Sequence, residues 1–236
     1  MKKYFFNPYI GEKYEEGING KRVLVLGASF YCSFDGNKGR KKCEYYEDCA
    51  INQNCVKYNK CPHNHDKLLS DSAMGEIDEN GAKSYVRFCY FMRWIRNKCK
   101  TESFDEFWEK VAFTNYVQHI IGGRTTTHRS DLREEYLEMF VSVLEELEKR
   151  KGLPDIIIVW GRVVDKPLKK NYAIPDHSNC KIEIDEEKEG YIFKWKNFNG
   201  KDIIFINIYH PSYSKFYTDA EWEKMYELFK PILGLE

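Results

Sequence analysis

Three runs of apolar, mostly β-branched residues stand out along the chain, and each ends where polar residues or glycine begin. They occupy residues 22–27, 155–161 and 202–208. Runs of this length with such boundaries are typical of strands buried on both faces of a parallel sheet. Residues 111–114 form a fourth, weaker run. The pattern therefore predicts four core strands.

Helical periodicity separates these strands. Between Asp131 and Gly152, apolar residues recur every three to four positions, as at Tyr136, Phe140 and Leu144. An Asp131-to-Glu134 capping box would begin this helix, and Gly152 with Pro154 would end it. Shorter helices are expected at 84–98, 103–110 and 219–228. Alternating strands and helices predict an α/β fold with a central, mostly parallel four-stranded sheet, helices on both faces, and a ligand site at the carboxyl ends of the strands.

Two segments interrupt this alternation. Residues 33–80 are polar, rich in Asn, Lys and Cys, and lack a period, so they are interpreted as an insertion that needs its own stabiliser. Residues 181–198 predict an added β-hairpin, in which the Asn199-Gly200 turn leads into the last core strand. The 236 residues suit one core, and we expect a single domain over 1–236 that contains the Cys-rich insertion.

Composition bears on partners and location. Lys plus Arg and Asp plus Glu both number 37, so the whole molecule does not attract a polyanion, and any nucleic-acid contact needs a local basic patch. The first residues contain no secretory h-region, and no apolar run approaches the length that spans a membrane. We expect a cytoplasmic monomer without a membrane partner.

Short segments at the predicted strand ends share an order known from one family. A Gly-x-x-x-Tyr motif, Gly27 to Tyr31, follows the first strand, and Asn115 follows a middle strand. Trp160-Gly161 follows a later strand, and His210-Pro211-Ser212 follows the last one. In this combination the chain resembles the uracil-DNA glycosylase superfamily. The resemblance covers most of the chain outside the insertion and the hairpin.

The resemblance implies roles for four residues. Cleaving an N-glycosidic bond in DNA requires the nucleotide to leave the stack and enter a pocket that reads its edge. Asn115 would read the base, since an amide offers one donor and one acceptor group. His210 would donate a hydrogen bond to the base oxygen as charge builds on the leaving group. Tyr31 would close the pocket against ring substituents, and Phe30 is a candidate stacking face.

The same resemblance implies phosphate contacts and one departure. Pro211 and Ser212 match the loop that grips a DNA phosphate. Independently of the resemblance, Arg124, Arg129 and Lys215 lie in or beside the site loops and are candidate phosphate contacts. Well-known members carry an acidic residue in the first motif, where this chain has Ala28 and Ser29. The Ser29 hydroxyl can hold a water, although it is a poor general base at neutral pH.

The insertion contains a regular ladder of cysteines at every sixth position: Cys43, Cys49, Cys55 and Cys61. In a chain without a secretory signal, eight cysteines argue against structural disulfides. Four thiolates in a coreless segment suggest a metal site, because metal binding supplies folding energy. Zinc is the preferred occupant, and a [4Fe–4S] cluster is the alternative. Reduced cysteines without any metal are the third interpretation.

The sequence therefore predicts a monofunctional DNA glycosylase that hydrolyses the N-glycosidic bond of a flipped uracil-like or modified base. Its partner would be single- or double-stranded DNA, in repair or in defence against foreign DNA. The alternative is a nucleobase or nucleic-acid binding protein of the same fold with little or no hydrolytic activity. A different α/β enzyme that happens to end a strand in His-Pro-Ser is the third possibility.

Overall fold

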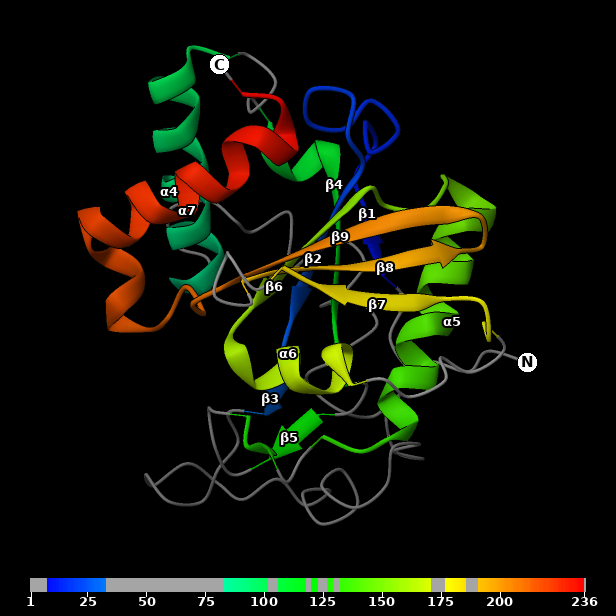
Figure 1. Ribbon diagram of the computed structural model, residues 1–236. Coiled ribbons are helices and arrows are strands. Elements are labelled where there is room, and N and C mark those ends of the chain that lie inside the picture. Colours follow the sequence, from blue (N-terminus) through cyan, green and yellow to red (C-terminus); the bar gives the residue numbers. More distant parts are fainter. Residues whose placement is uncertain are drawn as a thin grey trace.

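The computed structural model describes residues 8–32, 83–101, 106–117, 120–122, 127–129, 132–170, 177–185 and 191–235. They form an α/β fold around a mixed sheet of seven strands (Figure 1). In sheet order, the strands are β1 (Tyr9–Ile10), β4 (Val111–Asn115), β2 (Val23–Gly27), β6 (Ile156–Trp160), β9 (Lys201–Ile208), β8 (Ile192–Phe198) and β7 (Lys181–Ile184).

The four central strands are those that the apolar runs predict. β4, β2, β6 and β9 follow one another in the sheet, and each is parallel to the next. The expectation of a four-stranded sheet is nevertheless wrong, because three antiparallel strands extend it. The predicted hairpin, β7 and β8, adds to the free edge of β9, and the two-residue β1 adds to β4. Backbone N–H and C=O groups of an uncovered edge recruit such strands.

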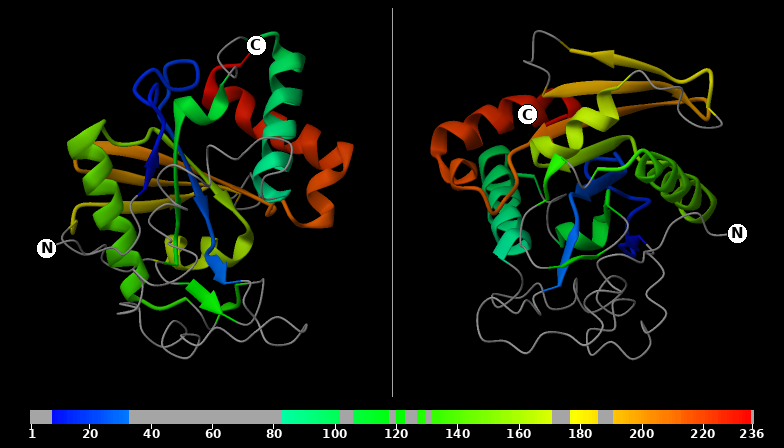
Figure 2. Two further views of the ribbon diagram at one scale, coloured as in Figure 1. Left: turned by 180° about the vertical axis from the view of Figure 1, so that it is seen from behind. Right: turned by 90° about the horizontal axis from the view of Figure 1, so that it is seen from below.

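Helices cover both faces of the sheet. α4 (Lys83–Cys99) and α7 (Asp219–Leu233) lie on one face, and α5 (Glu135–Arg150) and α6 (Arg162–Lys169) on the other (Figures 1 and 2). Helix α6 is absent from the sequence-based prediction. It has eight residues and carries Pro167 in its interior, a residue that normally argues against a helix because it removes one backbone donor.

Alternation along each central strand builds two separate cores. In β2, Leu24 and Leu26 contact the α5 and α6 side, while Val23 and Val25 contact the α4 and α7 side. All four side chains are buried. Because successive strand residues point to opposite faces, a continuous apolar run is what a strand between two helical layers requires.

Two predicted helix starts differ from the structure. The helix expected at 103–110 is, in its described part, a 3-10 turn at Phe107–Lys110 (η4). α5 begins at Glu135, and Glu134 precedes it without a capping side-chain hydrogen bond, while Asp131 lies outside the described residues. A second 3-10 turn, η6 (Ser214–Tyr217), precedes α7.

The first motif also behaves differently from a simple loop. Residues Phe30–Cys32 form strand β3, which pairs in parallel with β5 (Ile120–Gly122) as a separate two-stranded sheet. Figure 1 shows this pair beyond the lower ends of the central strands. The chain after β2 thus keeps an extended path and is held by backbone pairing.

No helix in the described part of the chain combines the length and apolar character needed to cross a bilayer.

The start of α7 provides a test of the local prediction. The Thr218 side chain accepts a hydrogen bond from the backbone N–H of Glu221, as the capping pattern predicts. Replacing Thr218 with Ala should lower the free energy of unfolding by about 1 kcal/mol, because one N–H of the first turn loses its partner. Urea denaturation of the two proteins measures this. Thr218→Ser, which keeps the oxygen, should unfold at the wild-type midpoint.

Candidate functional site

The predicted site segments follow the carboxyl ends of four adjacent parallel strands. Asn115 ends β4, Gly27 ends β2, Trp160 ends β6, and His210 comes two residues after β9. The connection that leaves β2 includes α4 on one face, whereas α6 leaves β6 on the other. Strands whose connections diverge in this way leave a crevice at their carboxyl ends, which is where open α/β sheets bind ligands.

Asn115 is placed by its contact with Gly27. The two residues face each other in the parallel ladder, and Asn115 is only 3% exposed. A Cβ atom on Gly27 would lie 2.0 Å from the Asn115 Oδ1 atom, so the amide occupies the space that a side chain would fill. Backbone bonds from Tyr116 and Val117 to the carbonyls of Gly27 and Ala28, both 2.9 Å, extend the pairing past the strand ends. The amide is therefore buried with a defined position.

His210 is held as a neutral ring of one tautomer. Its Nδ1 atom accepts a hydrogen bond from the Ser212 backbone N–H at 3.2 Å and lies 2.7 Å from the Ser212 hydroxyl. Burial lowers the pKa of His210 to about 4, so the ring is uncharged at neutral pH. Since a backbone N–H only donates, Nδ1 is the acceptor and the single ring proton resides on Nε2. The ring thus offers one N–H donor to a ligand.

The Trp160-Gly161 pair supports this histidine. The rings of Trp160 and His210 meet edge to face with centroids 6.0 Å apart. Gly161 has a φ of 93°, a conformation that side-chain-bearing residues rarely adopt, and its N–H donates to the Ile208 carbonyl at 2.9 Å. The Trp-Gly motif therefore positions the ring that follows β9.

Ser29 is engaged with a residue that the sequence does not single out. It is nearly buried, and its hydroxyl forms a short hydrogen bond with the Thr127 hydroxyl. This bond occupies one of the groups with which Ser29 would hold a water. No carboxylate stands in the segment from Gly27 to Cys32.

The His-Pro-Ser loop presents the other predicted contacts. Pro211 is buried, whereas Ser212 and Lys215 are exposed. Arg87 of α4 reaches the loop from the side, with its Nη1 atom 3.5 Å from the Ser212 carbonyl oxygen. Ser212 therefore presents exposed polar groups next to His210.

Cations and tyrosines gather beside this loop. The Arg162 guanidinium and the Lys224 ammonium lie 5.2 Å and 4.3 Å from the centroid of the Tyr191 ring. The Lys215 ammonium lies 5.8 Å from the centroid of the Tyr209 ring. We call Arg162, Lys215, Lys224, Tyr191 and Tyr209 the basic-aromatic patch. Burial raises the pKa of Glu221 at its centre, and the three cations oppose that shift.

Several predicted site residues remain without structural description. Phe30 and Tyr31 lie on β3, but the positions of their side chains are not among the described features, and Arg124 lies outside the described residues. So do the four cysteines of the ladder, at 43, 49, 55 and 61. Within the ranges that are described, no three His, Cys, Asp or Glu side chains are grouped closely enough to hold a metal ion.

The topology brings the ends of β4, β2, β6 and β9 to one edge, with β4 and β9 separated by three strand spacings, about 14 Å. A nucleobase and its sugar could bridge that span. Sequence reasoning missed Thr127, Arg87 and Lys224, because each joins the site through a contact across the fold. No local pattern marks a surface Thr, Arg or Lys for such a role.

Comparison with models of known protein families finds no match for this chain. Curated protein sequences also show no match.

The Gly27–Asn115 contact is open to a double-mutant cycle. Gly27→Ala should destabilise the protein by about 1–3 kcal/mol, because the new methyl group displaces the buried amide. In an Asn115→Ala background the same change should cost less, since the clashing oxygen is absent. Urea denaturation of the four proteins gives the coupling energy. Additive costs would show that Gly27 is required for another reason.

The neutral state of His210 links stability to pH. The folded pKa of about 4 lies below the unfolded value, so the unfolded chain binds a proton first as pH falls. The stabilisation is complete above about pH 6.5 and is lost towards pH 4; at pH 4.5 the loss is about 2–3 kcal/mol. His210→Asn should remove this component. Unfolding free energies at pH 7.5 and 4.5 should therefore differ less in the variant, and equal differences would contradict a buried neutral ring.

Proposed function

We propose that this protein is a DNA glycosylase of the uracil-DNA glycosylase type, which hydrolyses the N-glycosidic bond of a flipped uracil-like or modified base. The observation that carries the proposal is the partly buried, neutral His210, whose remaining ring proton is on Nε2. It stands at the same sheet edge as the buried Asn115 amide. A base reader and a preorganised donor are the two functions that the reaction needs.

The chemistry follows from these groups. When the glycosidic bond breaks, the base leaves with negative charge on its ring and carbonyl oxygens. The His210 Nε2–H would donate to one such oxygen, and a neutral donor in a dry site stabilises the charge without giving up its proton. The Asn115 amide would hold the base edge so that this oxygen faces His210. Water would then add to the sugar carbon that the base has left, and the proton that this water loses would neutralise the departed base anion.

The basic-aromatic patch supports DNA as the substrate. The chain as a whole has no net charge, so attraction for a polyanion has to be local. Arg162, Lys215 and Lys224 concentrate positive charge next to the His-Pro-Ser loop. Tyr209 and Tyr213, with ring centroids 5.6 Å apart, add surfaces on which unpaired bases stack. This arrangement favours a substrate with single-stranded character at the site.

The second candidate is a nucleobase or nucleic-acid binding protein that uses the same site without efficient hydrolysis. The engagement of the Ser29 hydroxyl with Thr127 favours it, because the segment from Gly27 to Cys32 has no carboxylate and one of the groups with which Ser29 could orient a water is already in use. Base recognition by Asn115 and the phosphate contacts of Ser212 and Lys215 would remain.

The cysteine ladder is proposed to hold a zinc ion, with a [4Fe–4S] cluster as the alternative for the same four thiolates. Elemental analysis of the purified protein distinguishes the two metals and the metal-free state.

The decisive test uses oligonucleotides, single- and double-stranded, that each contain one uracil, hypoxanthine, xanthine or modified pyrimidine. Alkali cleaves any base-free site that the protein produces. We expect cleavage at one of these bases, with a loss of about 10²–10³ in rate for His210→Ala, since one transition-state donor is removed. Asn115→Ala should lose cleavage and discrimination between bases.

Asn97→Ala is the matched control, because Asn97 is exposed on α4 away from the strand ends. It should cleave at the wild-type rate. Binding measured by fluorescence anisotropy separates the two candidates. If the affinity depends on the base and the DNA stays intact across the panel, the protein is the binding protein and not the glycosylase. Equal affinity of the wild type and Asn115→Ala for every oligonucleotide, again without cleavage, would exclude both.

A further inference from the structure

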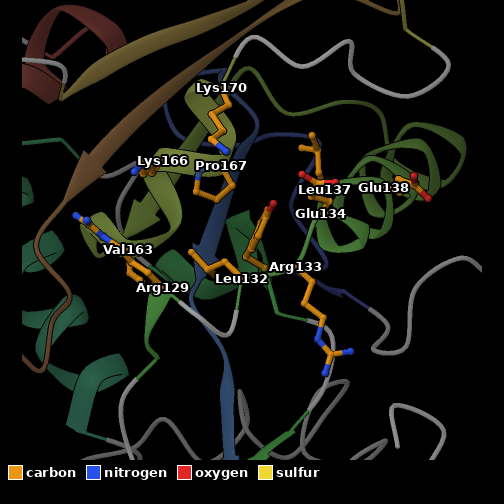
Figure 3. A pocket seen from close by; sticks show the side chains of 11 residues that line it. Arg129, Leu132, Arg133, Glu134, Leu137, Glu138, Val163, Lys166, Pro167 and Lys170 are labelled. Atoms are coloured by element: carbon orange, nitrogen blue, oxygen red, sulfur yellow. The ribbon is translucent and has the colours of Figure 1, made fainter. Parts of the chain in front are cut away.

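A cavity of about 390 Å³ lies between α5 and α6, on the face of the sheet opposite α4 and α7. Figure 3 shows the side chains that line it. His210, Asn115 and Ser29 are not among them. Asn115 belongs to the other face, since Phe113, two residues before it in β4, packs with the α4 and α7 core. The cavity is therefore a separate feature from the proposed base site.

Apolar side chains form the walls of this cavity. Leu132 precedes α5, Leu137 lies in its first turn, and Val163 and Pro167 come from α6. The volume falls in the range of small-molecule sites, which are mostly apolar with a few polar groups that fix the ligand. A single ring system with one substituent fits such walls.

Charged side chains of both signs surround the mouth, and Arg133 lies on the same side as the carboxylates. Figure 3 shows the nitrogen ends of Arg129 and Lys166 on one side of the cavity and the carboxylates of Glu134 and Glu138 on the other. Arg129 and Lys166 form no ion pair with another described residue. Two cations without a carboxylate partner suit an anionic group, and the opposite carboxylates suit hydroxyl or amine donors of the same ligand.

A buried hydroxyl supplies the most specific polar group. Tyr116 lines the cavity and has no exposed surface, yet its hydroxyl has no hydrogen-bond partner among the described residues. Burial raises the pKa of Tyr116, so the group stays protonated and able to donate. An unpartnered buried hydroxyl costs stability, and a ligand acceptor would compensate that cost.

We propose that this cavity binds a small organic phosphate of the nucleoside monophosphate class. The phosphate contacts Arg129 and Lys166, the ring lies between the walls of α5 and α6, and ring or ribose donors face Glu134. The Tyr116 hydroxyl donates to an acceptor on the ring. This is a second binding site on the molecule, and its occupancy does not depend on whether the protein cleaves DNA.

Calorimetric titration of the full-length protein with individual nucleoside 5′-monophosphates tests the proposal. At least one should bind, and the matching nucleoside and inorganic phosphate should each bind at least about tenfold more weakly, because each lacks half of the contacts. Arg129→Ala and Lys166→Ala should each weaken nucleotide binding about tenfold. Lys149→Ala, an exposed change in the last turn of α5, is the control and should bind as the wild type does.

The Tyr116 hydroxyl provides a second readout that needs no ligand. Tyr116→Phe should raise the melting temperature of the ligand-free protein by about 2–4 °C, because the unpartnered hydroxyl is removed. It should also reduce the further rise in melting temperature that a saturating nucleotide produces. Absence of binding by every nucleotide, equal binding of nucleosides, or a lower melting temperature of ligand-free Tyr116→Phe would each overturn the assignment.

Discussion

The register of β2 is the constraint on which the rest of the structure depends. This strand is bonded in parallel to β4 on one side and to β6 on the other, so its five residues align both neighbours. A shift of one residue would exchange Val23 and Val25 with Leu24 and Leu26 between the two cores. It would also take Gly27 away from Asn115, and the buried amide would meet a side chain. The register that packs the core is therefore also the register that places the Asn115 amide.

On the proposed function, the site would combine one well-prepared group with one that is poorly suited to its role. His210 is well prepared, because burial keeps the ring neutral and the Ser212 N–H selects the tautomer that can donate. The first motif is less suited to activating water, since Ser29 is bonded to Thr127 and no acidic residue follows Gly27 before β3 ends. In the proposed glycosylase, such a site would stabilise a departing base more than it would activate a nucleophile. It would work best on a base that is already a good leaving group, where charge stabilisation contributes most of the acceleration.

Polar side chains on the two faces of the sheet differ in whether they have partners. On the α4 and α7 side, the partly buried His210 and the buried Asn115 have defined contacts at the strand ends. On the α5 and α6 side, the Tyr116 hydroxyl is buried without a hydrogen-bond partner among the described residues, beside a cavity rimmed by Arg129 and Lys166. Phenylalanine would fill the same space without an unpartnered hydroxyl, and a ligand acceptor would offset the cost that this hydroxyl carries.

The sequence by itself determined the four central strands, the long helices and the cap at Thr218, because these depend on local apolar period and on capping within one turn. It also indicated Asn115 and His210 through the motif. It did not reveal α6, whose Pro167 argues against a helix, nor that the hairpin and β1 would extend the sheet to seven strands. Only the tertiary structure decided that Ser29 binds Thr127, that Arg87 reaches Ser212, and that Tyr116 lies beside a cavity. Those contacts join residues far apart in the chain, and no local pattern encodes a distance through space.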